Sequence, residues 1–146
     1  MQIRPMEAFD AGAILSIQSE CPEIAQWSES DYDFSGKPGF AGWVADKNHA
    51  VAGFLVCRRV ASDIEILNFA VRGDSRRQGA GALLLQTALD WGRGIRAEKA
   101  FLEVRESNST ALRFYERHGF RITGRRSRYY SSPSEDALLL ETSFSE

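Results

Sequence analysis

The feature that most constrains the fold is an apolar segment that runs into a glycine-containing loop and then into an amphipathic stretch. Residues 64–71, IEILNFAV, are typical of a buried β-strand. After the loop RGDSRRQG, apolar residues recur with i, i+3, i+4, i+7 spacing from Gly81 to Ala88, which predicts a helix that runs to about Arg93. A strand, a loop and a helix in this order predict one β–α unit.

The rest of the chain also alternates between strand and helix patterns. Further strands are expected at residues 1–4, 40–45, 51–60, 100–104, 120–130 and 137–142. Helices are expected at residues 8–19 and after Asn108, a good N-cap, with Gly119 as the C-terminal stop of the second helix. Residues 23–39 are expected to be irregular or to hold a short helix, because Gly and Pro interrupt them.

The order of these elements predicts the topology. Strand, helix, strand and helix across residues 64–118 imply parallel neighbours joined by a right-handed crossover, whereas the other strands pair as hairpins. We therefore expect an α/β fold in which a central mixed, mostly antiparallel sheet is flanked by helices, formed by one domain over residues 1–146. Ligands of such sheets bind beyond the carboxyl ends of the parallel strands, where the loop RRQGAG lies.

Composition excludes several classes of protein. The chain has 18 basic and 20 acidic residues and a net charge of −2, which argues against a dedicated nucleic-acid binder. Cys21 and Cys57 are too few for a disulfide framework or a zinc site, so we expect two free thiols. His49 and His118 stand alone, so no metal site is expected. Without a membrane-spanning run or signal peptide, the chain is expected to work in the cytoplasm.

The loop RRQGAG, residues 76–81, is suited to bind an anion. A helix that starts in glycines exposes unpaired N–H groups at the positive end of its dipole, and the two arginines add charge. The loop matches neither the GxxxxGK[ST] phosphate loop nor the GxGxxG dinucleotide fingerprint. The alternative is an ordinary glycine turn with surface arginines, and these six residues alone do not decide between the two.

A second pattern after the next strand suggests a family. RRQGAG at residues 76–81 is followed by NSTALRFY at residues 108–115 and then by ERHGF. Together these motifs resemble the GNAT family of acetyl-CoA-dependent N-acetyltransferases, and the resemblance covers nearly the whole chain, most firmly residues 64–142. It implies that the anion is the pyrophosphate of coenzyme A, that acetyl-CoA is the cosubstrate and that no metal is required.

A narrower resemblance concerns the acceptor. LEVRESNSTALRFYERHGF, GRRSRYY and EDALLLE resemble the RimI-type branch, which acetylates protein N-terminal α-amines and whose bacterial member modifies the N-terminal alanine of a small-subunit ribosomal protein. Trp27 and Ser28 match a Pro-Trp-Ser or Pro-Trp-Thr motif of that branch, with Gln26 in place of the proline. Ser131 stands where a proline commonly follows the Tyr-Tyr pair. Both departures lie in loops expected to contact the acceptor.

The resemblance implies roles for individual residues. Glu103 would be the general base, acting through water on an α-amine whose pKa is near ~8, and Tyr115 the general acid that protonates the coenzyme A thiolate. The alternatives are an outward-facing strand glutamate and a core tyrosine. The residues expected to bind acetyl-CoA are Phe69, Ala70, Val71, Arg76, Arg77, Gln78, Gly79, Ala80, Gly81, Ala82 and Asn108. Of these, the backbone of residues 69–71 would hold the pantetheine and the acetyl carbonyl, with an N–H near Val71 for the oxyanion.

Partners follow from the same resemblance. Trp27, Ser28, Tyr129 and Tyr130 are expected to bind an acceptor peptide, and the alternative for the two tyrosines is a half-buried strand position. Residues 135 and 136, Glu-Asp, either attract a basic acceptor or simply start a solvated strand. We expect a monomer or weak dimer without direct nucleic-acid or membrane contact. Other hypotheses are a lysine or small-molecule acceptor, and a non-catalytic coenzyme A-binding or ribosome-binding module that uses residues 125–128. The presence of both Glu103 and Tyr115 argues against that module.

Overall fold

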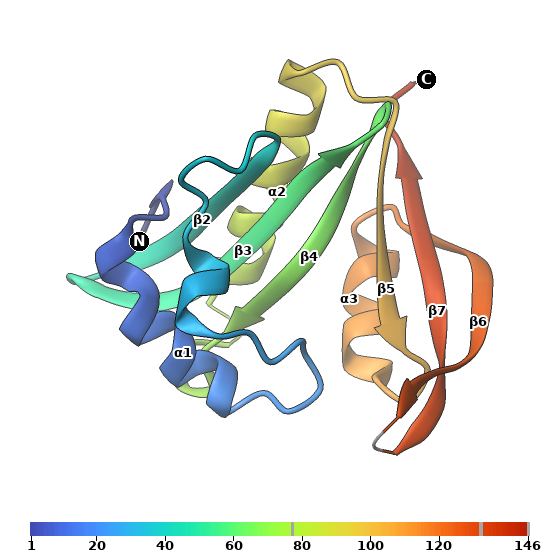
Figure 1. Ribbon diagram of the computed structural model, residues 1–146, viewed down its shortest axis with the longest axis horizontal. Coiled ribbons are helices and arrows are strands. Elements are labelled where there is room, and N and C mark those ends of the chain that lie inside the picture. The colour runs from blue at the N-terminus through green and yellow to red at the C-terminus, as the bar shows by residue number, and fades with distance from the viewer. Residues whose placement is uncertain (77, 132, 146) are drawn as a thin grey trace.

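The sheet has the mixed, mostly antiparallel arrangement expected from the sequence. The computed structural model describes residues 1–76, 78–131 and 133–145 (Figure 1). Its strands are β1 (Gln2–Pro5), β2 (Phe40–Lys47), β3 (Ala50–Val60), β4 (Asp63–Val71), β5 (Lys99–Arg105), β6 (Arg121–Ser131) and β7 (Ser134–Ser143). They are ordered β1-β2-β3-β4-β5-β7-β6, and among the described residues only β4 and β5 pair in parallel. The predicted hairpins and the predicted parallel crossover are confirmed.

Within the described ranges, three α-helices flank this sheet. They are α1 (Ala11–Ser19), α2 (Ala80–Gly94) and α3 (Ser109–Arg117), with short 3₁₀ turns η1 (Ala8–Asp10), η2 (Glu29–Tyr32) and η3 (Gly73–Ser75). The expected helix at residues 8–19 therefore begins as a 3₁₀ turn. The Asp10 carboxylate, which accepts the Glu7 N–H at 2.8 Å, closes that turn as a capping box.

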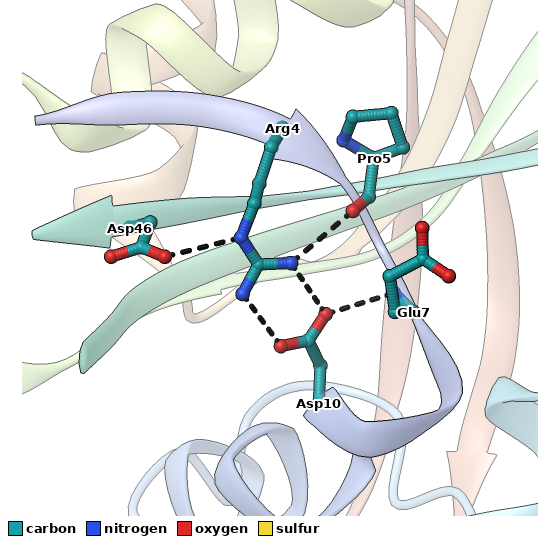
Figure 2. Close-up of polar contacts among 5 residues, drawn as sticks. All are labelled: Arg4, Pro5, Glu7, Asp10 and Asp46. Carbon is teal, nitrogen blue, oxygen red and sulfur yellow. Dashed lines mark hydrogen bonds and ion pairs between the residues drawn. The ribbon is translucent and has the colours of Figure 1, made fainter. Parts of the chain in front are cut away.

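An ion-pair network fixes the start of α1 against the sheet (Figure 2). The Arg4 guanidinium donates to both carboxylate oxygens of Asp10, at 2.8 and 2.9 Å, and to Asp46 Oδ2 at 3.1 Å. Burial by itself would raise the pKa of Asp10, but the Arg4 and Glu7 hydrogen bonds outweigh it and lower that pKa. Since Arg4 lies on β1 and Asp46 on β2, the network ties two strands to the first turn of the chain.

The two faces of the sheet bury separate apolar clusters. On one face, side chains of α2 and α3 pack against β3, β4, β5 and β7, with Leu84 and Leu85 fully buried. On the other face, α1 and η2 pack over β2, β3 and β4, where Ile14 and Phe54 are fully buried. The sheet is therefore covered by α2 and α3 on one side and by α1 on the other (Figure 1).

The sheet splits between its two parallel strands. Within the described residues, β4 and β5 pair only through Ile64 with Ala100 and Glu65 with Phe101. A bulge follows at Leu67, because the β3 partners shift there by one residue. Beyond this point β4 and β5 diverge toward their carboxyl ends (Figure 1). The split lies where ligands of parallel strands are expected.

Candidate active site

The first part of the candidate site is the edge of β4 that faces the split. The Arg72 N–H donates to Ala52 O at 2.8 Å, on the β3 side. Because peptide groups alternate along a strand, those of Val71 and Phe69 point to the opposite edge, whereas that of Ala70 points to β3. The Val71 carbonyl accepts from the Arg76 Nε on that open side at 3.2 Å. The end of β4 thus presents backbone donors and acceptors to which an extended ligand can add as a strand.

The second part is the N-terminus of α2. Gly79 is the N-cap residue, with φ of 89°, a left-handed conformation that glycine adopts without steric cost. It has no side chain to cap the helix, so the first-turn N–H groups of Ala80, Gly81 and Ala82 are directed out of the helix end. A 15-residue helix that begins in this way favours an anion at its end. A Cβ at Gly81 would lie 3.5 Å from the Phe114 ring, so α3 packs closely on this turn.

The side chains of the loop have other contacts. Arg76 folds back, with its Nε near Val71 O and its Nη2 3.4 Å from the Cys21 Sγ. The Gln78 side chain accepts from the Lys47 ammonium and donates to the Asp74 carbonyl. Arg77 lies outside the described residues. In this structure the loop therefore offers its backbone to the split, and Arg76 and Gln78 hold the loop in place.

Tyr115 lies on α3, on the side of the split that α2 and α3 cover. It is 8% exposed and stands among aromatic rings, with centroids 6.3 Å from Phe69, 5.4 Å from Phe114 and 5.4 Å from Phe120. Burial raises the pKa of Tyr115 well above its ordinary value, so the hydroxyl keeps its proton at neutral pH. None of the hydrogen bonds found in the described part of the chain involves this hydroxyl. Asn108 caps the same helix, with Oδ1 accepting the Ala111 N–H at 3.2 Å, as predicted.

Glu103 lies on β5 and faces the other side of the sheet. Its neighbours Leu102 and Val104 are buried toward α2 and α3, so alternation directs Glu103 away from them. The Glu103 side chain is 14% exposed, and the Arg126 Nε of β6 lies 3.2 Å from its Oε2. That Oε2 is buried and has no well-aligned hydrogen bond in the described residues. A carboxylate and a protonated phenol therefore flank the split from opposite faces of the sheet.

The loop between α1 and β2, residues 20–39, covers the split on the Glu103 side of the sheet, and we call it the roof loop. The Trp27 ring packs on Tyr32 with centroids 5.0 Å apart, and the Trp27 carbonyl accepts from Gln18 Nε2 at 2.9 Å. Ser28 caps η2, with its N–H donating to Asp31 Oδ2 at 2.8 Å. The Gln26 amide, at the position of the family's proline, donates to the carbonyls of Cys21 and Ile24, both at 3.1 Å, and of Gln18 at 3.4 Å. The glutamine thus rigidifies the loop through hydrogen bonds.

A buried polar chain that the sequence analysis did not single out joins this loop to β4. The Asn68 amide donates to Ala25 O at 3.1 Å and to the Tyr32 hydroxyl at 2.9 Å. Tyr32 in turn donates to Gln18 Oε1, and burial raises the pKa of Tyr32 to about 12. The one sequence signal for this chain is a polar asparagine inside the apolar strand ILNFAV. These hydrogen bonds of Asn68, the residue before Phe69, fix the position of the roof loop relative to the open edge of β4.

The hairpin of β6 and β7 lies next to β5, on the side of the split opposite β4. Three residues of β6, 127–129, lie between its pairings with Ala137 and Glu135, and this bulge leaves Tyr129 51% exposed. The Arg105 guanidinium lies over the Tyr130 ring at 4.2 Å. Burial and then the charge of Glu103 raise the pKa of Tyr130, so its hydroxyl lies in the field of that carboxylate.

The two acidic residues near the start of β7, Glu135 and Asp136, already have partners. Glu135 accepts from Arg105 at 3.0 Å and from the Ser107 N–H and hydroxyl, both at 3.1 Å. Asp136 accepts from the Arg125 guanidinium at 2.6 Å and from the Arg128 N–H at 2.9 Å. Glu135 thus joins β7 to the end of β5 and the residues that follow it, and Asp136 joins β7 to β6.

The remaining reactive side chains stand apart from the split. Within the described ranges neither cysteine forms a disulfide, and burial raises the pKa of Cys57 to about 12. His118 is the C-cap residue of α3, and burial lowers its pKa. The described residues contain no group of three or more potential metal ligands and no helix that could span a membrane. A hollow of about 420 Å³ beside α1 is lined by Arg4, Phe9 and His49 among others, and it does not reach Glu103 or Tyr115.

Comparison with known proteins defines the class. Residues 11–120 match the model of the acetyltransferase (GNAT) family, so the chain belongs to this family and is an N-acetyltransferase. Members of the family use acetyl-CoA. The predicted family resemblance is thereby confirmed.

Individual relatives indicate which branch of the family the chain resembles. The [ribosomal protein bS18]-alanine N-acetyltransferase of Escherichia coli K12 is 29% identical over 140 residues, 94% of each chain. A putative enzyme of the same description from Bacillus subtilis is 32% identical over 103 residues, 70% of this chain and 68% of the relative. The crystal structure of the ribosomal-protein-S18-alanine N-acetyltransferase from Escherichia coli has a TM-score of 0.87 at 28% identity, covering 99% of this chain and 94% of that one. The chain is thus similar to the RimI-type branch along almost its whole length.

Proposed function

We propose that the chain transfers the acetyl group of acetyl-CoA to the α-amine of a protein N-terminus, by direct attack in a ternary complex. The specific acceptor we propose is the N-terminal alanine of a small-subunit ribosomal protein. The observation that carries the proposal is the split between β4 and β5, which a carboxylate and a protonated tyrosine flank from opposite faces. The relatives that acetylate bS18 alanine support this choice of acceptor.

In this proposal acetyl-CoA is held chiefly by backbone groups. Phe69 and Val71 hydrogen-bond the pantetheine as an added strand on the open edge of β4. The N-terminus of α2, from Gly79 to Ala82, accepts the pyrophosphate. The Val71 N–H stabilises the oxyanion that forms on the acetyl carbonyl.

The chemistry divides between the two sides of the split. Glu103, directly or through water, takes a proton from the acceptor ammonium, and the freed amine attacks the thioester carbon. The tetrahedral intermediate collapses with cleavage of its C–S bond, and Tyr115 gives its phenolic proton to the departing thiolate. The acceptor ammonium loses two protons in all: one replaces the proton that Tyr115 has donated, through solvent, and the other is released, so the products are an acetylated amine, free coenzyme A and one proton.

The acceptor residue is held, we infer, by the roof loop and the β6–β7 hairpin. Trp27, Ser28, Tyr129 and Tyr130 are the side chains assigned to it, because they stand on the Glu103 side of the sheet or at its rim. Gln26 and Ser131 replace prolines of the branch in these two segments. They are therefore the positions at which we expect any difference in acceptor preference from the relatives to arise.

The test uses two matched peptides and acetyl-CoA. One begins with a free alanine, and the other has the same sequence with a blocked N-terminus and internal lysines. Mass spectrometry should find a single acetyl group on the α-amine of the first peptide and none on the second. Equal acetylation of the blocked peptide would transfer the assignment to lysine, and turnover confined to small amines would exclude a protein acceptor.

A further inference from the structure

The pairing of Glu103 with Arg126 is set by the register of three strands. Glu103 of β5 lies opposite Leu139 of β7, and Ala137, two residues along β7, lies opposite Arg126 of β6. Residues that face each other across strands, or that lie two apart on one strand, share a face of the sheet. Arg126 is therefore on the same face as Glu103, and its Nε lies 3.2 Å from the carboxylate.

Two other arginines of this region, Arg105 and Arg125, have carboxylates of their own. Arg105 lies 3.0 Å from Glu135. Arg125 projects to the α3 face, where it contacts Glu106 and Asp136, each at 2.6 Å. Arg126 alone among these three is placed on Glu103, and its side chain is 62% exposed against 14% for the glutamate. Because most of the Arg126 side chain is in solvent, it can move away from Glu103 without disturbing the core.

We propose that Arg126 occupies the place of the acceptor's ammonium group at Glu103 in the free enzyme, and that the acceptor enters as an ammonium ion that displaces it. The inference rests on the proposed function, since it assigns Glu103 to the acceptor amine. The exchange keeps one positive charge beside the carboxylate throughout binding. Once Arg126 has left, the ammonium N–H bond breaks, its electron pair stays on nitrogen, and the proton passes to the Glu103 carboxylate.

This exchange defines the class of acceptor. An α-amine, with a pKa near ~8, or a lysine amine carries the required positive charge at neutral pH. Arylamines and hydrazides are uncharged there and leave Glu103 without a cation when Arg126 departs. Displacing the arginine also opposes acceptor binding, because an ion pair whose arginine is largely exposed must be broken. Such pairs contribute at most about 1 kcal/mol, which corresponds to about a fivefold change in affinity.

The experiment compares Arg126→Gln with Arg126→Lys and with Arg125→Gln. Steady-state kinetics use an alanine-starting peptide with uncharged side chains at saturating acetyl-CoA, and melting temperatures check that each variant is folded. Arg126→Gln should lower the peptide KM about two- to fivefold and leave kcat within about twofold. Arg126→Lys should keep the parent KM, because it retains the cation, and Arg125→Gln should keep it because Arg125 faces away from Glu103.

Contrary results separate the two proposals. A peptide KM that is unchanged or raised in Arg126→Gln, or lowered equally in Arg125→Gln, overturns the displacement while the acetyltransferase assignment stands. If the parent acetylates lysine peptides but no α-amine, the N-terminal assignment fails, and the same KM comparison with the lysine peptide decides the displacement. If the parent acetylates no amine, the proposed function fails, and the displacement fails with it.

Discussion

The two sides of the split are built from different parts of the chain. The side assigned to acetyl-CoA consists of peptide groups at the end of β4 and at the start of α2. The side assigned to the acceptor consists of side chains, with Glu103, Arg126 and Tyr130 on the sheet and Gln26 and Trp27 above it. Backbone geometry survives many side-chain changes, whereas contacts between side chains depend on the identity of each partner.

This difference explains what relatives share. A TM-score of 0.87 at 28% identity means that the backbone fold persists while most side chains differ. The network of Gln18, Tyr32 and Asn68 lies between the two sides and holds the roof loop on β4. Substitutions on the acetyl-CoA side should therefore act through the backbone, and those on the acceptor side through single contacts.

The largest expected effect is that of Glu103→Gln, which removes the base and keeps the shape. At pH 7 kcat/KM for an alanine-starting peptide should fall about 100-fold, because general base catalysis is lost. The deficit should shrink as the pH rises above ~8, where the amine loses its proton in solution. Rates measured from pH 6 to 10 check both. Glu141→Gln, on neighbouring β7, is the control, and equal rates for Glu103→Gln and the parent at pH 7 would remove Glu103 from the mechanism.

Tyr115→Phe tests the opposite face. The ring and its packing remain while the proton donor is lost, so kcat should fall at least ~10-fold, with water supplying part of the missing acid catalysis. The acetyl-CoA affinity and the melting temperature should change little. Calorimetry, thermal unfolding and kinetics together check this. A destabilised variant with an intact kcat per folded molecule would make Tyr115 a core residue only.

Gly79→Val tests the backbone side. The residue has φ of 89°, which a β-branched side chain resists, and its isopropyl group would stand at the helix end that receives the pyrophosphate. The calorimetric Kd for acetyl-CoA should rise about 10-fold, or about 1.4 kcal/mol. Gly94→Ala, at the far end of the same helix and with open space around it, is the control. An unchanged Kd in a folded Gly79→Val protein would place the pyrophosphate elsewhere.

Gln26→Ala should have the smallest effect and the most selective one. The substitution removes the amide contacts with the carbonyls of Cys21, Ile24 and Gln18, which loosens the roof loop. One net hydrogen bond is worth about 1 kcal/mol, so the acceptor KM should rise about three- to fivefold while the acetyl-CoA Kd is unchanged. Gln86→Ala, on the exposed surface of α2, is the control. A parallel change in both constants would show that the two sides are not separate.

Much of the frame was predictable because its signals are local. Residues 64–71 and the spacing that follows them predicted β4 and α2, and Asn108 predicted the start of α3. The boundaries of helices differ from those predicted where a local contact competes with the α-helix. At residues 8–10 the Asp10 carboxylate closes a 3₁₀ turn instead. The roles of Glu103, Tyr115 and the acetyl-CoA residues came from the family resemblance and stay predictions.

By itself the sequence determined the order of strands and helices, the capping of α3 and the family, because periodicity, capping and motif spacing lie within short segments. Only the tertiary structure decided which side chains meet. From the sequence alone we predict that Arg76 helps to bind phosphate, and in the structure its guanidinium contacts Cys21, 55 residues away in the sequence. The Asn68 amide hydrogen-bonds the Ala25 carbonyl, 43 residues away. The place of Arg126 on Glu103 depends on the register of β5, β7 and β6. Register and packing are set by the whole sheet at once, because each strand must bury its apolar face against all its neighbours.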